Sequence, residues 1–112
     1  MTKYLISFPA EAMVLTAEGL AAADTESHAV IEEAKAAGVH VFGGGINEAA
    51  DTLLVAPDGS VKPGGYAGRR LNGGFTVLEL PNREAALEWA RKIATACRCP
   101  QELREFMYDP AS

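Results

Sequence analysis

The chain has 112 residues, of which 48% are hydrophobic and 22% are charged, and its formal net charge is -5 at pH 7. This length and composition predict a single globular domain over residues 1–112, and they exclude a disordered or fibrous chain. The acidic balance argues against a nucleic-acid partner, because phosphate binding depends on clustered Lys and Arg side chains.

The first 23 residues resemble a secretory signal in their early lysine and their run of small residues, but Pro9, Glu11 and Glu18 interrupt the apolar stretch. No apolar run approaches the roughly 20 residues that a membrane-spanning helix needs. We therefore expect a cytoplasmic protein without a membrane partner.

Residues 4–8 are aromatic and β-branched and predict a first strand that ends before Pro9. The period-two alternation of a strand places Tyr4, Ile6 and Phe8 on one face.

Small and apolar residues recur at helical spacing from Thr16 to Ala37, which predicts a helix that ends at Gly38. Thr16 is one candidate N-cap, and Asp24 or Thr25 offers a later start. His28 lies off the apolar stripe of this helix, so it is expected either to point toward a cavity or to be a surface or capping histidine of the first helical turn.

Residues 39–42 alternate with period two and predict a second strand with His40 and Phe42 on one face. The three glycines at 43–45 indicate a β-bulge or the close approach of another backbone or a ligand. A third strand is predicted at 52–55, followed by a turn at 57–60 and a short return strand from Val61.

A glycine-rich surface loop is predicted at residues 62–73. Long loops in compact domains are often functional. Tyr66, Arg69 and Arg70 form its polar and aromatic cluster, and guanidinium groups bind carboxylates and phosphates well. They are therefore candidate ligand-binding residues, with solvated loop arginines as the alternative.

Residues 75–80 predict the fourth main strand, and Asn82 is a good N-cap for a helix that runs to about Ala96. Residues 103–108 are predicted to close the sheet as a last strand, although residues 101–104 alone would also suit a helical turn. Cys97 and Cys99 are predicted to be reduced thiols, with a redox or metal role as the alternative. A metal site would need further soft ligands that the chain lacks, and we expect no cofactor.

This order of elements predicts an α+β fold of the ferredoxin-like split βαβ type, with both helices on one face of an antiparallel sheet and an added hairpin. The other sheet face is expected to be apolar, formed by Tyr4, Ile6 and Phe8 with either the Val39/Val41 or the His40/Phe42 set. Because a lone domain seldom exposes such a face, we expect a homodimer whose sheets face one another or form a shared barrel.

Three segments together resemble the YCII-related family, in the subgroup named for a D-G-P-F motif: M-T-K-Y-L-I-S-F, H-A-V-I-E-E-A-K-A-A-G-V-H-V-F-G-G-G-I and L-N-G-G-F-T-V-L-E-L-P-N-R-E-A-A-L-E-W-A. The resemblance covers about residues 3–94. It implies dimeric α/β-barrel association, similar to muconolactone isomerases and small antibiotic-biosynthesis monooxygenases. It also implies a pocket with a catalytic histidine early in the first helix, and His28 occupies that position.

One motif departs from this pattern, because Pro63-Gly64-Gly65-Tyr66 stands where the subgroup carries D-G-P-F. The aspartate has no counterpart, which puts a mechanism that needs it in doubt. Glu48 or Asp51 is the expected acidic partner of His28, and His40 is expected either to line the same cavity or to be a packing residue.

Two hypotheses for function follow. The first is a small-molecule binding protein with a cavity between the sheet and the first helix, where His28 acts as an acid or base in a lyase, isomerase or cofactor-independent oxygenase reaction. The second is a non-enzymatic binding or regulatory module that acts through its dimer and the loop at 62–73.

Overall fold

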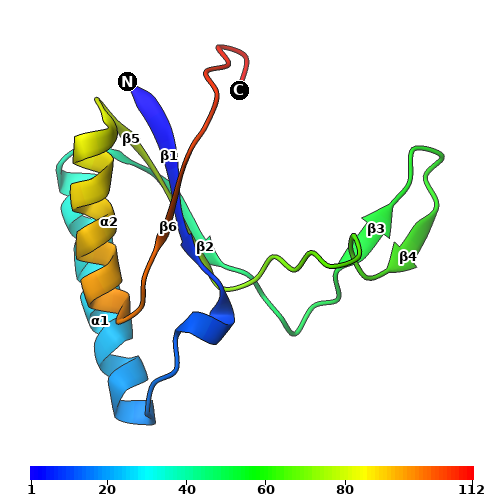
Figure 1. Ribbon diagram of the computed structural model, residues 1–112, viewed down its shortest axis with the longest axis horizontal. Helices are drawn as coiled ribbons and strands as arrows, with labels where there is room; N and C mark the ends of the chain where they lie inside the picture. Colours follow the sequence, from blue (N-terminus) through cyan, green and yellow to red (C-terminus); the bar gives the residue numbers. More distant parts are fainter.

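Two long helices and an antiparallel four-stranded sheet form the body of the computed structural model, which describes residues 1–112 (Figure 1). The elements in chain order are β1 (Thr2–Phe8), the 3₁₀ helix η1 (Ala10–Ala12), α1 (Ala17–Ala36), β2 (His40–Gly45), β3 (Leu53–Val55), β4 (Val61–Pro63), β5 (Gly74–Leu80), α2 (Arg83–Cys97) and β6 (Glu102–Glu105). The main sheet has the order β2-β5-β1-β6, and β3 pairs with β4 in a separate hairpin. The predicted α+β class is confirmed, and the topology is compatible with a ferredoxin-like fold.

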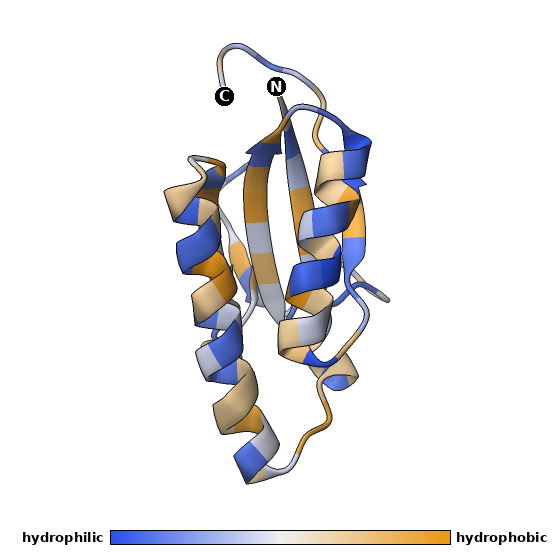
Figure 2. Cartoon of the chain, turned by 90° about the vertical axis from the view of Figure 1, so that its left-hand side faces the viewer, coloured by the Kyte–Doolittle hydropathy of each residue, from blue (hydrophilic) through white to orange (hydrophobic).

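Both helices cover the same side of the sheet (Figure 2). Tyr4 and Ile6 of β1 point toward the helices and are buried, with 3% and 1% of their surface exposed. The prediction that they form the uncovered face is therefore wrong. A strand can bury only one of its two side-chain sets against the helices, and the larger apolar set is the one buried.

The opposite side of the sheet, here called the helix-free face, carries the alternate residues of each strand. Leu5 pairs with Val77, and Val77 pairs in turn with Phe42, so these three side chains lie on that face. Phe75 joins them two positions along β5. The face is apolar at its centre, as expected, but it is built from a different set of residues.

A β-bulge in β2 separates the two residues that were expected to share a face. His40 pairs with Leu78 and Phe42 pairs with Val77, so Val41 is an extra residue in the ladder. An extra residue reverses the alternation that follows it. His40 therefore faces the helices while Phe42 lies on the helix-free face, and the prediction that they point the same way is wrong.

The helix boundaries follow the capping residues. Thr16 is the N-cap of α1, and its Oγ1 accepts a hydrogen bond from the Gly19 N–H at 3.1 Å, so the later start at Asp24 or Thr25 is not used. Asn82 caps α2 in the same way, accepting from the Ala85 N–H at 2.9 Å. Each cap satisfies a backbone donor that the first helical turn leaves without a partner.

The core lies between α2 and the centre of the sheet, where Ile6, Leu78 and Leu80 are fully buried. α2 buries a stripe of five residues against them, whereas α1 buries only Ala23 and Ala34 along its whole length. No helix has both the length and the apolarity that a membrane crossing requires.

Candidate functional site

A cavity of about 860 Å³ lies between α1, the end of α2 and the glycine-rich end of the sheet. The small residues Ala23 and Ser27 line it from α1, together with the larger Leu20 and Ile31. Of the 22 residues that line it, 10 are hydrophobic, so the lining is a mixture of apolar and polar residues.

Glycines form the sheet side of this cavity, at residues 43–45 of β2 and at Gly73 and Gly74 next to β5. Gly73 has φ +82°, and a Cβ added there would stand 2.0 Å from the Phe8 carbonyl oxygen. A Cβ added to Gly74 would stand 2.6 Å from the Phe8 ring. These two glycines therefore allow β1 and its aromatic side chain to approach closely. The close approach was predicted at residues 43–45 instead, where added Cβ atoms meet their nearest neighbours at 3.3 Å or more, and the bulge of β2 lies before those glycines, between His40 and Phe42.

His28 lines the cavity from the middle of α1, with 73% of its side chain exposed. The expectation of a histidine early in the first helix is wrong here, because the helix begins at Ala17. Its Nδ1 lies 2.7 Å from the Asp24 carbonyl oxygen. A carbonyl can only accept, so Nδ1 carries a proton, and in the neutral ring Nε2 has the free lone pair.

The carboxylate nearest to His28 belongs to Asp24, whose Oδ1 lies 3.5 Å from Nδ1. Neither Glu48 nor Asp51 lines the cavity, so the prediction that one of them is the acidic partner is wrong. Asp24 was missed although the i, i+4 spacing on a helix places the two side chains side by side.

His40 lines the same cavity from β2 and is half-buried. Its Nε2 lies 3.8 Å from where a Cβ on Gly43 would stand, so the imidazole lies along the glycine wall. The cavity thus brings together both histidines of the chain, one from the first helix and one from the strand that follows it.

The buried Cys97 also lines the cavity, and both cysteines are free. Burial raises the pKa of the Cys97 thiol, and the neighbouring Cys99 adds to this effect. Burial also raises the pKa of Cys99. Because the thiolate is the nucleophilic form, neither cysteine is activated for chemistry. No group of three His, Cys, Asp or Glu side chains is placed to hold a metal ion.

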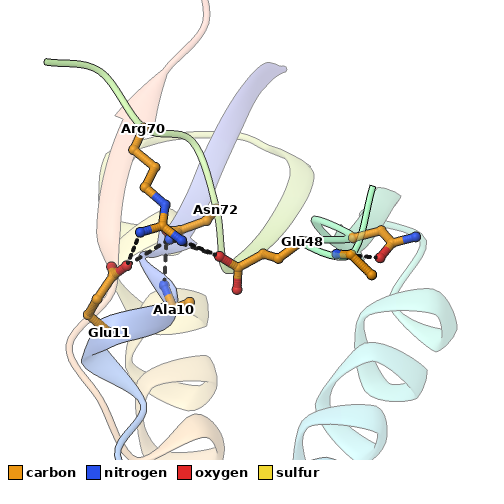
Figure 3. Close-up of polar contacts among 7 residues, drawn as sticks. Ala10, Glu11, Glu48, Arg70 and Asn72 are labelled. Carbon is orange, nitrogen blue, oxygen red and sulfur yellow. Dashed lines mark hydrogen bonds and ion pairs between the residues drawn. The ribbon is translucent and has the colours of Figure 1, made fainter. Parts of the chain in front are cut away.

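The loop candidates Tyr66, Arg69 and Arg70 do not line the cavity. Tyr66 is 75% exposed, and its carbonyl oxygen accepts from the Arg69 N–H within a turn. Arg70 turns back to the body, where its Nη2 donates to Glu48 Oε1 at 2.7 Å and its Nη1 lies 3.6 Å from Glu11 Oε1 (Figure 3). The two carboxylates therefore already occupy the guanidinium that was predicted to hold an anionic ligand.

Asn72 is the central residue of this second cluster and was not identified in the sequence as a candidate. Its side chain accepts from the Ala10 N–H at 3.1 Å and donates to Glu11 at 2.8 Å and to Glu48 at 3.4 Å (Figure 3). The hydrogen bond from Asn72 is the main reason that the pKa of Glu11 is lowered from its usual value. The cluster is a structural tie between η1 and the loop, since its donors and acceptors satisfy one another.

Comparison with models of known protein families finds no match, and comparison with curated proteins finds no significant similarity.

Proposed function

We propose that this protein binds a small, partly apolar molecule in the cavity between α1 and the sheet, against the side chains of His28 and His40. The observation that carries the proposal is that one cavity contains both histidines of the chain. Its volume of about 860 Å³ lies in the range of small-molecule sites, and its lining combines apolar walls with polar side chains.

The same site supports an acid–base reaction, of the lyase, isomerase or cofactor-independent oxygenase class. Because Nδ1 of His28 is held by the Asp24 carbonyl, Nε2 is the nitrogen available to remove a proton from a bound molecule. Asp24 Oδ1 at 3.5 Å stabilises the positively charged ring that results. The segments that resemble the YCII-related family support this reading, and membership of that family is part of the proposal.

We further propose that the protein is a homodimer of the dimeric α/β-barrel type that associates through its helix-free face. The accessible surface of the chain is 7779 Å². A compact monomer of 11.8 kDa exposes about 5900 Å². The excess of roughly 1900 Å² is of the size that one subunit of an obligate dimer buries.

The test of the cavity uses the two histidines as probes, because a spectrum of the imidazole protons contains only their signals. Small aromatic and aliphatic acids that raise the melting temperature are titrated into the protein. A molecule bound in the cavity shifts the signals of both rings, one from α1 and one from β2.

A matched pair of variants locates the binding. Ala21 and Ala29 are both exposed on α1, but only Ala21 lines the cavity. We expect Ala21→Phe to weaken binding at least about tenfold by filling the cavity, and Ala29→Phe to leave it unchanged. Equal affinities for the two variants, or a screen in which no compound shifts both rings, would contradict the proposal.

A second candidate function is a non-enzymatic binding or regulatory module that acts through its dimer and loop 62–73. It is favoured by the exposed apolar side chains around this loop, which include Val61 at 55%, Tyr66 at 75% and Leu71 at 73%. This candidate gains if no small molecule binds the cavity while variants of the loop lose a protein partner.

A further inference from the structure

Residues 46–73 form an arm that leaves the body between β2 and β5 and ends in the β3–β4 hairpin (Figure 1). Its effect on the shape is measurable. The radius of gyration is 15.8 Å, whereas about 13 Å is expected for a compact domain of this length. The hairpin therefore stands away from the core that would otherwise stabilise it.

One face of the hairpin is entirely apolar. The register pairs Leu53 with Pro63 and Val55 with Val61, which places these four side chains on the same face, and Leu54 with Lys62 on the other. Leu53, Val55 and Val61 are 55%, 65% and 55% exposed. An isolated two-stranded hairpin is marginally stable in water, so this apolar face needs a surface to pack against.

The helix-free face of the sheet has the complementary character. Its centre is formed by the half-buried Leu5, Phe75 and Val77, and Phe42 on the edge strand β2 is 64% exposed. Ion pairs between Lys3 and Glu79 and between Arg104 and Glu102, each at 3.1 Å, border it. An apolar centre with a polar rim is the usual composition of a protein interface.

The arm of a chain does not cover the helix-free face of that same chain. The Ile46 N–H bonds the Gly73 carbonyl at 2.9 Å, and Arg70 and Asn72 hold Glu48, so the base of the arm is fixed to the body. From that base the arm points away from the sheet (Figure 1). Within one molecule, therefore, the apolar face of the hairpin does not meet the helix-free face.

We infer that the β3–β4 hairpin of one chain packs its apolar face on the helix-free face of a second copy. In a two-fold symmetric dimer the contact occurs twice, once for each arm. Its two components, arm and sheet face, account for surface that the chain exposes in excess of a compact monomer. This inference rests on the proposed homodimer and adds the element that each subunit contributes to its partner.

The first test removes the apolar face and keeps the hairpin. Val55→Lys combined with Val61→Glu places an opposite-charge pair at directly paired positions, which supports the hairpin. The control, Leu54→Lys combined with Lys62→Glu, places the same pair on the other face. We expect the first variant to raise the dimer dissociation constant at least about 100-fold in sedimentation equilibrium, and the control to change it less than about threefold.

The outcomes separate the two proposals. A wild-type dimer that survives Val55→Lys with Val61→Glu overturns the role of the arm and leaves self-association standing. A wild-type protein that is monomeric at micromolar concentration overturns both.

A second test detects the contact directly. A chain with Val55→Cys is mixed with a differently tagged chain with Phe42→Cys and oxidised with diamide, while the native Cys97 and Cys99 stay buried. A disulfide between the two kinds of chain supports the inference. Disulfides formed only between two Phe42→Cys chains indicate sheet-to-sheet association without the arm and overturn it, as do those formed only between two Val55→Cys chains.

Discussion

At the scale of single residues, Gly73 is more constrained than the glycines that drew attention in the sequence. It combines a backbone conformation with φ +82° and a contact with the Phe8 carbonyl that leaves no room for a side chain. The run at 43–45 is more tolerant, since Cβ atoms added there meet their nearest neighbours at 3.3 Å or more. Those glycines shape the cavity wall, and Gly73 is required by the fold.

We predict that Gly73→Ala lowers the free energy of unfolding by about 3 kcal/mol or more, because strain at positive φ adds to a steric clash. Gly38→Ala is the matched control. Gly38 has φ +75° with nothing within 4 Å of its added Cβ, so only the strain of about 1–2 kcal/mol remains. Urea unfolding of both variants measures the difference, and similar losses would show that the contact with Phe8 is unimportant.

At the scale of elements, the arm is tied to the body by a cluster of polar side chains at its base. Asn72 is buried, with 4% of its surface exposed. It hydrogen-bonds Ala10 and Glu11 of η1 and also Glu48, the carboxylate that pairs with Arg70. Arg70 closes the cluster from the solvent side. The side-chain amide of Asn72 therefore fixes the base of the arm, because it accepts one hydrogen bond from η1 and donates others to Glu11 and Glu48.

We predict that Asn72→Asp destabilises the protein by about 2 kcal/mol at pH 7, because it removes the donor and sets a buried carboxylate beside Glu11 and Glu48. Like charges and burial raise the pKa of the introduced group, so its proton returns as the pH falls, and the loss shrinks toward pH 4. Urea unfolding at both pH values measures this.

Asn47→Asp is the control for this variant. Asn47 is exposed and its side chain only accepts, from the Ala49 N–H, so a carboxylate serves equally well there. A loss for Asn72→Asp that does not depend on pH would show that repulsion between carboxylates is not its cause.

At the scale of the whole molecule, the chain exposes two apolar surfaces that it does not cover itself. Fourteen of its 112 residues are buried, and the core occupies one side of one sheet. The helix-free face and the arm account for side chains such as Phe42 and Val55 that stand largely in solvent. Stability is therefore expected to come in part from association.

We predict that the melting temperature rises with protein concentration, by roughly 5 °C for a 100-fold increase, because mass action favours the folded dimer over two unfolded chains. Scanning calorimetry between about 1 and 100 μM measures the rise. The variant with Val55→Lys and Val61→Glu should melt at a temperature that does not depend on concentration. A wild-type melting temperature that is equally constant would contradict the dimer.

Much of the candidate site is predictable from local patterns. Thr16 and Asn82 are strong N-caps, and both helices begin after them. The strand predicted at residues 75–80 was confirmed as β5, with Leu78 and Leu80 buried on one face. The acidic partner of His28 was also predictable from the sequence, since Asp24 precedes it by one helical turn. These features depend on residues close in sequence, where spacing alone determines which side chains meet.

The sequence by itself determined the number, type and order of the main elements, because capping, periodicity and turn chemistry act within a few residues. Only the tertiary structure decided which face of β1 meets the helices, that the bulge at Val41 turns His40 toward the cavity, and that Arg70 is held by Glu11 and Glu48. Each of these depends on residues far apart in the chain. Which side chains are buried, and which carboxylates pair with a given arginine, is determined only when the strands and helices pack together.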